Sequence, residues 1–403
     1  MLFYCKRIYF EDGCKAGYFT IEDGKITSFF ETHDGEVDYC YENARIIPGI
    51  TDTHNHGGFG YRLGFEIYDD VKEEHVRQYL KGVTSTGVTS MLPTTTSLKC
   101  MSILADLSTQ EYVGAKIIGI HSEGPWGSRV GEKGVNTGYP AVDLEVAKQM
   151  VESSKGLLKL VGIAPEVENA HKAIEYFVSE NVNVAIYHSN ANYQQANESI
   201  DKGVSVATHL CNVMTGLHHR DVGIVGASLL RDEVTCEIIC DGLHVSLPMI
   251  ELILKMKDHD KIVMISDNVQ YAGVPSGRYV GFNAEEISDR KYIDVSDDGF
   301  VLSISGRLSG SGKPVLFGIY NLVEKLHMPI EEVLKFSSEN PIKKYGDFSK
   351  KGSLKVGKDA DFVVIDDEYQ VIATFIEGKK VYDHKDEKDF INWDFVKQFK
   401  QSN

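Results

Sequence analysis

Short apolar runs recur along the middle of the chain, and each is followed by a longer stretch in which polar and charged residues are mixed with apolar ones. The runs are GVTSMLPTT, KIIGIHSEG, LKLVGIAPE, VNVAIYHSN, VSVATHL, CEIICDG and KIVMISD. Strands that are buried on both faces have such continuous Val, Ile and Leu runs, and their alternation with helical stretches is typical of parallel βα units. The pattern predicts an α/β fold with a (β/α)8 TIM barrel from about residue 48 to residue 345.

The two ends of the chain have a different pattern, in which short segments are broken by turn residues. Residues 1–47 contain LFYCKRIYF, AGYFTIEDGKITSFF and ARII, separated by Asp-Gly and Gly-Lys turns that are typical of β-hairpins. Similar segments return in GSLKVGKDADFVVID and YQVIATFIEGKKVY. We therefore expect residues 1–47 and 346–384 to form one small β-sandwich, and residues 385–403 to form a charged linker and a terminal helix.

Charge and composition exclude several classes of protein. The formal net charge of −17, without any basic block, argues against nucleic-acid binding. No run approaches the ~18 apolar residues of a membrane span, and the N-terminus lacks the features of a secretory signal. The seven cysteines are scattered singly, which favours buried thiols in a reducing compartment over disulfides or a zinc knuckle. We expect a cytoplasmic protein.

Polar side chains that could carry chemistry stand at the ends of the predicted strands. They are His54, His56, Glu123, His188, His209, Asp241, His244 and Asp267. The carboxyl ends of parallel barrel strands converge on the face that holds the active site, so we expect these residues to meet there.

The spacing of two of these histidines points to a metal ion. His54 and His56 are two positions apart, so on an extended strand both imidazoles point to the same side and can bind one ion. An isolated His-x-His spacing also occurs where the histidines are hydrogen-bonded in a core or exposed at the surface. Glu123, His188 and His209 strengthen the prediction, because together the five offer nitrogen and oxygen ligands suited to Zn²⁺ or Fe²⁺.

Asp267 ends the run KIVMISD, where a buried carboxylate is costly unless a cation or a proton compensates it. Near a metal ion, this carboxylate could accept a proton from water and later deliver it to a leaving amine, as general base and then general acid. The alternative is a helix N-cap at a strand–helix junction.

Longer motifs extend this pattern over nearly the whole chain. They are PGITDTHNHGGFG, HSEGPW, GIAPE, YHSNANYQQANESIDKGVSVATHLCNVMTGLHHRDVGIVG, CDGLHV, ISDNVQYAGVPSGRY, RLSGSGKPV and KGSLKVGKDADFVVID. Together they resemble the N-acetylglucosamine-6-phosphate deacetylases of the amidohydrolase superfamily. The resemblance implies a barrel of the metal-dependent amidohydrolase type that removes the acetyl group from N-acetylglucosamine 6-phosphate.

The resemblance also implies roles for the strand-end residues. Glu123, His188 and His209 correspond to the core metal ligands, and Glu123 takes the place that a carbamylated lysine holds in some relatives. His54 and His56 match members that complete a second metal site, which favours two ions over one, with Asp267 close to one of them. His244 corresponds to the histidine that polarises the carbonyl oxygen. A cap or a structural hydrogen bond is the alternative for that histidine.

A pocket for an amino-sugar phosphate is implied as well. The phosphate lies near Asn212, Val213 and Arg220 in the family, and the arginine often reaches in from a neighbouring subunit of a homodimer or a larger assembly. Arginine suits this task because its planar fork binds phosphate oxygens in pairs, although a surface ion pair is the alternative. The implied substrate-binding residues are Asn136, Asn212, Val213, His219, Arg220, His244, Leu308, Ser309, Gly310 and Ser311.

Three departures from the family pattern concern the sugar and not the metal. Asn136 stands where a histidine is usual, Asn268 where a small residue is usual, and Gly312-Lys313-Pro314 where Thr-Leu is usual. The identity of the sugar therefore stays open. The alternatives are N-acetylgalactosamine 6-phosphate or another N-acylamino sugar, a cyclic amide or an isoaspartyl peptide, and an inactive scaffold.

Overall fold

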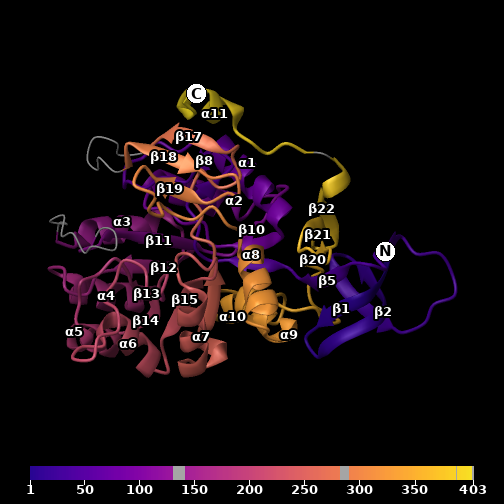
Figure 1. Ribbon diagram of the computed structural model, residues 1–403, viewed down its shortest axis with the longest axis horizontal. Coiled ribbons are helices and arrows are strands. Elements are labelled where there is room, and N and C mark those ends of the chain that lie inside the picture. The colour runs from indigo at the N-terminus through magenta and orange to yellow at the C-terminus, as the bar shows by residue number, and fades with distance from the viewer. Residues whose placement is uncertain (130–140, 282–289, 387, 402–403) are drawn as a thin grey trace.

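The computed structural model describes residues 1–129, 141–281, 290–386 and 388–401. Its largest part is a ring of parallel strands (Figure 1). One parallel sheet contains six of them, and β6 and β9 pair in a second sheet. The strands of the ring are β6 (Ile50–Asp52), β9 (Val88–Met91), β11 (Ile120–Trp126), β12 (Leu158–Ile163), β13 (Asn183–Ile186), β14 (Val204–Ala207), β15 (Thr235–Ile239) and β16 (Ile262–Ile265).

Backbone contacts at two places close the ring. Thr94, after β9, forms a parallel bridge with His121 in β11. On the other side, Asn55 bridges to Asn268, and the Asp267 N–H donates to the His54 carbonyl at 2.8 Å. The predicted (β/α)8 barrel is therefore confirmed, and its closure brings the segment after β6 next to the segment after β16.

Each strand of the ring is followed by at least one helix. The starts of two helices are fixed by side-chain caps, with Ser97 accepting from the Cys100 N–H, and Asn192 and Gln195 forming a capping box. The helices are α1 (Glu73–Gly82), α2 (Leu98–Leu107), α3 (Leu144–Ser153), α4 (Ala170–Ser179), α5 (Tyr193–Asp201), α6 (Gly223–Leu230), α7 (Leu247–Met256), α8 (Val315–Tyr320), α9 (Ile330–Leu334) and α10 (Asn340–Tyr345).

The two chain ends form a separate β domain beside the barrel, as the sequence predicts (Figure 1). Its strands make one continuous sheet in the order β22-β21-β20-β5-β1-β2-β3, with β4 paired to β1. The ends are joined where β5 runs antiparallel to β20. The strands are β1 (Leu2–Phe10), β2 (Gly13–Glu22), β3 (Lys25–Phe30), β4 (Tyr39–Cys40), β5 (Arg45–Pro48), β20 (Phe362–Ile365), β21 (Val371–Ile376) and β22 (Lys379–Asp383).

The core of this domain is aromatic. Phe362 and Phe375 stack with ring centroids 4.5 Å apart, and Phe3 meets both rings edge-on at 5.3 Å. Because Phe3 comes from the first strand and the other two from the last strands, this core holds the two ends of the chain together.

An antiparallel sheet that the sequence analysis did not predict follows β16. It consists of β17 (Gly277–Val280), β18 (Tyr292–Val295) and β19 (Val301–Ser303). The terminal helix α11 (Trp393–Phe399) packs on it, with Phe395 stacked on Tyr279 at 5.9 Å (Figure 1). The Asn392 N–H donates to the Phe59 carbonyl at 2.7 Å. The end of the chain therefore packs next to the loop that begins after His56, where short strands β7 (Gly57–Gly58) and β8 (Tyr61–Arg62) lie.

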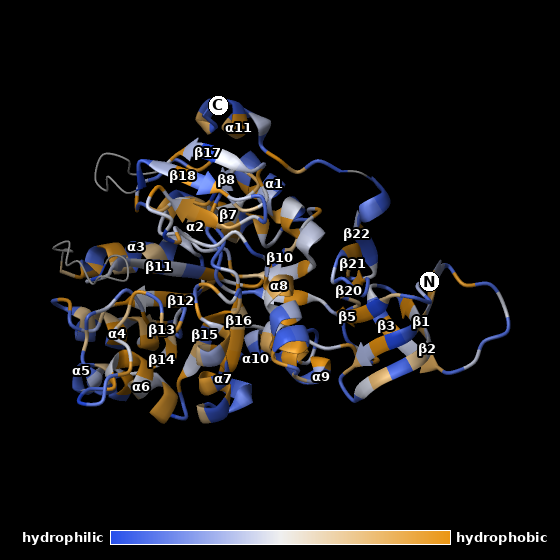
Figure 2. Ribbon diagram, viewed as in Figure 1, coloured by the Kyte–Doolittle hydropathy of each residue, from blue (hydrophilic) through white to orange (hydrophobic). Residues whose placement is uncertain are grey.

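Apolar residues dominate the barrel strands, and β13, β15 and β16 are largely orange in Figure 2. Every residue of β15 and β16 is buried. Within the described part of the chain, the helices are too short or too polar to cross a membrane.

Candidate metal centre and active site

Six of the predicted side chains meet at the carboxyl ends of the barrel strands. His54 and His56 follow β6, Glu123 lies in β11, and the other three come directly after β13, β14 and β16. They form two groups in which the possible ligand atoms lie within 4.8 Å of one another. The first group is His54, His56 and Asp267, and the second is Glu123, His188 and His209.

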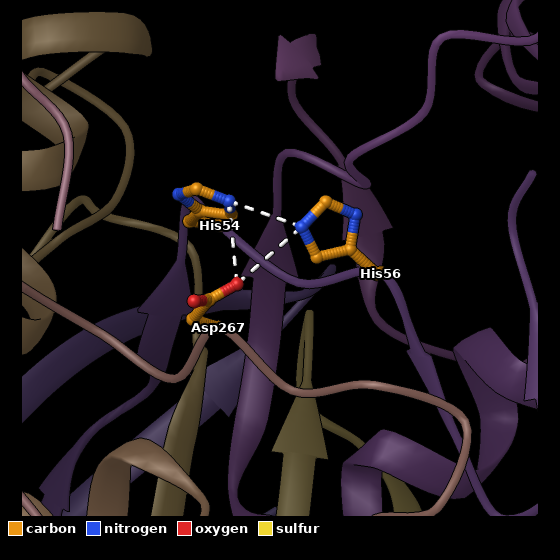
Figure 3. Close-up of side chains that lie close together, drawn as sticks. All are labelled: His54, His56 and Asp267. Carbon is orange, nitrogen blue, oxygen red and sulfur yellow. Dashed lines mark hydrogen bonds and ion pairs between the residues drawn. The ribbon is translucent and has the colours of Figure 1, made fainter. Parts of the chain in front are cut away.

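The first group is compact (Figure 3). The Nε2 atoms of His54 and His56 are 3.2 Å apart, and Asp267 Oδ1 lies 3.4 Å from each of them. The three side chains therefore point their ligand atoms toward one another, although Asp267 is more than 200 positions away in the chain.

Glu123 connects the two groups. Its Oε1 atom lies 2.8 Å from His209 Nε2 and 3.4 Å from His188 Nε2. Its Oε2 atom lies 3.0 Å from His56 Nε2 in the first group. One carboxylate thus faces both groups, as a ligand shared by two ions would.

Three of these residues adopt a backbone conformation that favours glycine. The φ angles are 39° at His188, 32° at His209 and 52° at Asp267. Left-handed backbone at residues other than glycine costs free energy and persists where the surrounding structure enforces it, commonly at functional sites. Each of these residues lies within two positions of the end of its strand, so the turn directs the side chain toward the shared site.

The electrostatics of the site favour a cation. Burial raises the pKa of Asp267, but the charges of His54 and His56 outweigh it and hold this pKa at about 2. Burial likewise opposes ionisation of Glu123, and the surrounding histidines bring its pKa well below the ordinary value. Burial lowers the pKa of His54, yet the two carboxylates raise it well above the usual range. Two ionised, partly exposed carboxylates are therefore surrounded by imidazoles.

This donor set fits a divalent transition metal. Imidazole nitrogens together with carboxylate oxygens suit Zn²⁺ or Fe²⁺, and two carboxylates that lie so close together favour a positive charge nearby. The chemistry and spacing of the residues present are thus those of a metal centre.

A buried carboxylate that the sequence analysis did not identify lies behind His54. Glu237 in β15 is fully buried, and its Oε2 accepts the Thr208 hydroxyl at 2.8 Å while its Oε1 accepts the Thr53 hydroxyl at 3.0 Å. Thr208 Oγ1 also lies 2.9 Å from His54 Nδ1. The signal for this residue was a charge in the interior of the apolar run CEIICDG, because glutamate is rarely fully buried without partners.

A second missed carboxylate connects two loops of the site. Glu166 accepts the Asn190 N–H at 2.6 Å and the Ser189 hydroxyl at 2.7 Å, both directly after His188. It also accepts the hydroxyl of Ser128, in the loop that follows Glu123. The motif GIAPE contains this glutamate, but the motif does not indicate which loops the side chain connects.

His244 is held by Asp241, as a residue of an active site would be. His244 Nδ1 lies 2.6 Å from Asp241 Oδ2, and Asp241 Oδ1 accepts the backbone N–H groups of Leu243 and His244 at 2.9 and 2.8 Å. Burial raises the pKa of Asp241, but the hydrogen bond and charge of His244 outweigh it, so this pKa lies below the usual value. The carboxylate in turn favours a positively charged imidazole.

Two predicted substrate segments lie close to these residues. The Asn212 amide donates to the His244 carbonyl at 2.9 Å, and its neighbour Val213 accepts the Ser189 N–H at 3.1 Å. The segment Leu308–Ser311 runs beside Asp267, since the Ser311 N–H donates to the Asp267 carbonyl at 3.1 Å.

The remaining predicted residues are not gathered at the metal centre. His219 and Arg220 are exposed. Asn136 lies outside the described residues. Asn268 is next to Asp267, and its carbonyl accepts the His56 N–H at 2.6 Å.

Known proteins share this architecture over nearly their full length. The model of the amidohydrolase family matches residues 45–381. N-acetylglucosamine-6-phosphate deacetylase of Bacillus subtilis is 29% identical over 92% of this chain and 94% of that protein. N-acetylgalactosamine-6-phosphate deacetylase of Escherichia coli O157:H7 is 33% identical over 83% of this chain and 87% of that protein. The crystal structure of N-acetylglucosamine-6-phosphate deacetylase from Pasteurella multocida is 26% identical, with a TM-score of 0.81 over 94% of this chain and 99% of that one. The chain therefore belongs to the amidohydrolase family.

Proposed function

We propose that this enzyme hydrolyses the acetamide of N-acetylglucosamine 6-phosphate to glucosamine 6-phosphate and acetate. The observation that carries the proposal is the position of Asp267, which lies 3.4 Å from the nearest nitrogens of His54 and His56. The names of relatives that align with about nine tenths of the chain, from Bacillus subtilis (92%) and Vibrio furnissii (90%), support the same reaction.

His54, His56 and Asp267 would hold one ion of Zn²⁺ or Fe²⁺, and Glu123, His188 and His209 would hold a second. A bound divalent ion lowers the pKa of its water toward about 7 and polarises a carbonyl oxygen. Asp267, which is ionised at neutral pH, accepts the proton of the attacking water and delivers it to the amine that leaves. His244, oriented by Asp241, donates a hydrogen bond to the acetyl oxygen as negative charge develops there.

The phosphate would be bound at the outer side of the pocket. Arg220 and His219 are exposed, so they can reach a ligand of this subunit or of a neighbouring one. We assign Arg220 to the pocket of the second subunit of a homodimer, where Asn212 and Val213 complete the phosphate site. Leu308–Ser311 and Asn136 would contact the sugar.

The substrate and the cysteines both agree with a cytoplasmic enzyme. A phosphorylated sugar does not cross membranes freely, and four of the seven cysteines are buried thiols.

Acetate release from N-acetylglucosamine 6-phosphate tests the reaction directly. The change Asp267→Asn removes the general base and should abolish turnover, whereas Asp258→Asn, on a turn before β16 at the opposite end of the strand, should leave it unchanged. A wild-type protein that carries its metal and releases no acetate would contradict the assignment.

A second candidate substrate is N-acetylgalactosamine 6-phosphate. The relative from E. coli O157:H7, with 33% identity, is named for that epimer. Asn268, beside Asp267, stands where the family usually has a small residue, so the pocket next to the sugar differs in shape. Comparing kcat/KM for the two epimers decides between the substrates, and a preference for the galacto sugar would replace the first assignment with the second.

The role of phosphate and of the neighbouring subunit can be tested together. Arg220→Ala should raise KM for the phosphorylated sugar and leave the slower reaction of the unphosphorylated sugar unchanged. Mixing Arg220→Ala subunits with inactive Asp267→Asn subunits should restore the wild-type KM for the phosphorylated sugar, because a mixed dimer contains one intact site. Equal use of both sugars by the wild type would contradict the role of Arg220, and failure of the mixture would place Arg220 in its own subunit's pocket.

A further inference from the structure

We propose that Glu237, acting through Thr208, is a positioning residue that fixes the proton of His54 on Nδ1 and so prepares Nε2 to bind an ion. The inference rests on the proposed metal centre and extends it into the barrel interior. Neither residue belongs to the ligand set, and each lies in or directly after a barrel strand behind the site.

The direction of the hydrogen bonds follows from the number of protons available. An ionised carboxylate only accepts, so the single hydroxyl proton of Thr208 is donated to Glu237 Oε2 at 2.8 Å. The Thr208 oxygen must then accept from its other neighbour, His54 Nδ1, at 2.9 Å. A neutral imidazole carries one proton, and with that proton on Nδ1 the lone pair is on Nε2.

That lone pair faces the metal centre. His54 Nε2 lies 3.4 Å from Asp267 Oδ1 and 3.6 Å from Glu123 Oε1. If the proton were on Nε2 instead, this nitrogen could not be a ligand. The bond to Thr208 therefore matters for metal binding even though Thr208 itself lies outside the centre, because hydrogen bonds behind a ligand set its tautomer and orientation.

The burial of Glu237 is otherwise difficult to explain. It is completely buried, and His54, at 3.8 Å, is its single ion-pair partner within the described ranges. Burying a charge costs several kcal/mol unless it is compensated, so an unused glutamate would be a liability inside a barrel. A role in orienting His54 explains why a glutamate is buried at this position.

A separate ion at Glu237 does not fit the same contacts. His54, His121 and Glu237 lie close enough together to hold one. However, His54 Nδ1 is engaged by Thr208, and His121 Nδ1 lies 3.2 Å from the Thr53 carbonyl, to which it can only donate. An ion there would require His54 to lose both of its protons. His121 and Glu237 therefore belong to the hydrogen-bonded surroundings of His54 and do not form a further ion site.

Titration of the chelator-treated protein with Zn²⁺ tests the inference. Thr208→Val removes the hydroxyl with little change in shape and should weaken one of the two ions by roughly 10- to 100-fold, leaving the other unchanged. Thr208→Ser, which keeps the hydroxyl, should restore wild-type affinity. Thr53→Val is the matched control, because Thr53 also bonds to Glu237 but not to the His54 ring.

The outcomes separate this inference from the proposed function. Unchanged affinity in Thr208→Val, or equal weakening in Thr53→Val, would overturn the role of Glu237 and Thr208. A wild-type protein that binds no ion at the His54 group would instead overturn the metal centre itself, whatever the variants do. If Thr208→Val does not fold, ¹⁵N shifts of the His54 ring in the Zn²⁺-loaded wild type decide, since a proton on Nε2 with the ion on Nδ1 would refute the proposal.

Discussion

Replacing Asp241 by asparagine should slow the reaction and leave the metal ions in place. Asp241 Oδ2 lies 2.6 Å from His244 Nδ1, while Oδ1 accepts two backbone N–H groups. Asparagine has the same shape and can keep the bonds of Oδ1, so the loop should not change. What is lost is the negative charge beside the imidazole.

The size of the effect follows from the kind of bond. Asp241 is only 6% exposed, so water cannot replace the interaction. A hydrogen bond to a charged group is worth about 1.5–3 kcal/mol. If that stabilisation acts in the transition state, its loss lowers kcat/KM by roughly 10- to 150-fold.

The dependence on pH should change as well. With Nδ1–H donated to Asp241, the Nε2 atom of His244 carries a proton only when the ring is positively charged. The wild-type rate should therefore fall as pH rises and the ring loses that proton. In Asp241→Asn the amide donates to Nδ1, so a neutral ring keeps its proton on Nε2. The variant should lose the alkaline decline while remaining slower at its optimum.

Steady-state acetate release across pH, with metal content measured by mass spectrometry, checks this reasoning. Asp258→Asn is a suitable control, because Asp258 also accepts a backbone N–H but lies at the opposite end of β16. An unchanged kcat/KM in Asp241→Asn would refute the role of His244 as a charged donor. Loss of metal would show that Asp241 acts on the centre instead.

Three further predictions concern the metal centre and stability. The double change His54→Asn and His56→Asn should lower the metal content by one ion without unfolding the barrel, as metal analysis and circular dichroism would show. Burial raises the pKa of Glu11, but bonds that include one from Lys355 outweigh it and hold the pKa at about 2, below the ordinary 4.5. The ionised group therefore stabilises the fold above about pH 4.5, and this is lost as pH falls toward 2. Glu11→Gln should lower Tm at neutral pH, with a difference that vanishes in acid. Phe375→Ala, at a fully buried ring, should cost about 3–5 kcal/mol in urea unfolding, and a smaller cost would contradict the aromatic core.

The barrel could be predicted from the sequence because its strands are buried on both faces. All residues of β15 are buried, so the strand appears as a continuous apolar run. The sheet β17–β19 gave no such signal. Its strand Tyr292–Val295 is short and alternates half-buried with buried residues, and the sheet packs against the distant helix α11 through β17. The pairing of β5 with β20 was equally hidden, because it joins segments about 300 residues apart.

The strand-end residues of the site could be predicted from topology, but the residues that hydrogen-bond behind them could not. A polar residue at the end of a parallel strand is placed by the barrel itself, which is why His188 and His209 were found. Glu237 lies inside a strand, where position alone does not distinguish a structural charge from a functional one. The role that we propose for it depends on the structure, in which β14 and β15 place Thr208 between the Glu237 carboxylate and His54.

Glu123 lies between the two groups of side chains and faces both of them. Its two oxygens lie 2.8 Å from His209 and 3.0 Å from His56, so a single charge serves both groups. A glutamate in a barrel strand is permanent, whereas a carbamylated lysine in the same place depends on carbon dioxide. The centre of this chain should therefore assemble from metal and protein alone. Because Glu123→Gln halves the negative charge of the site, it should weaken both ions together, while changes at His54 or His188 should weaken mainly one.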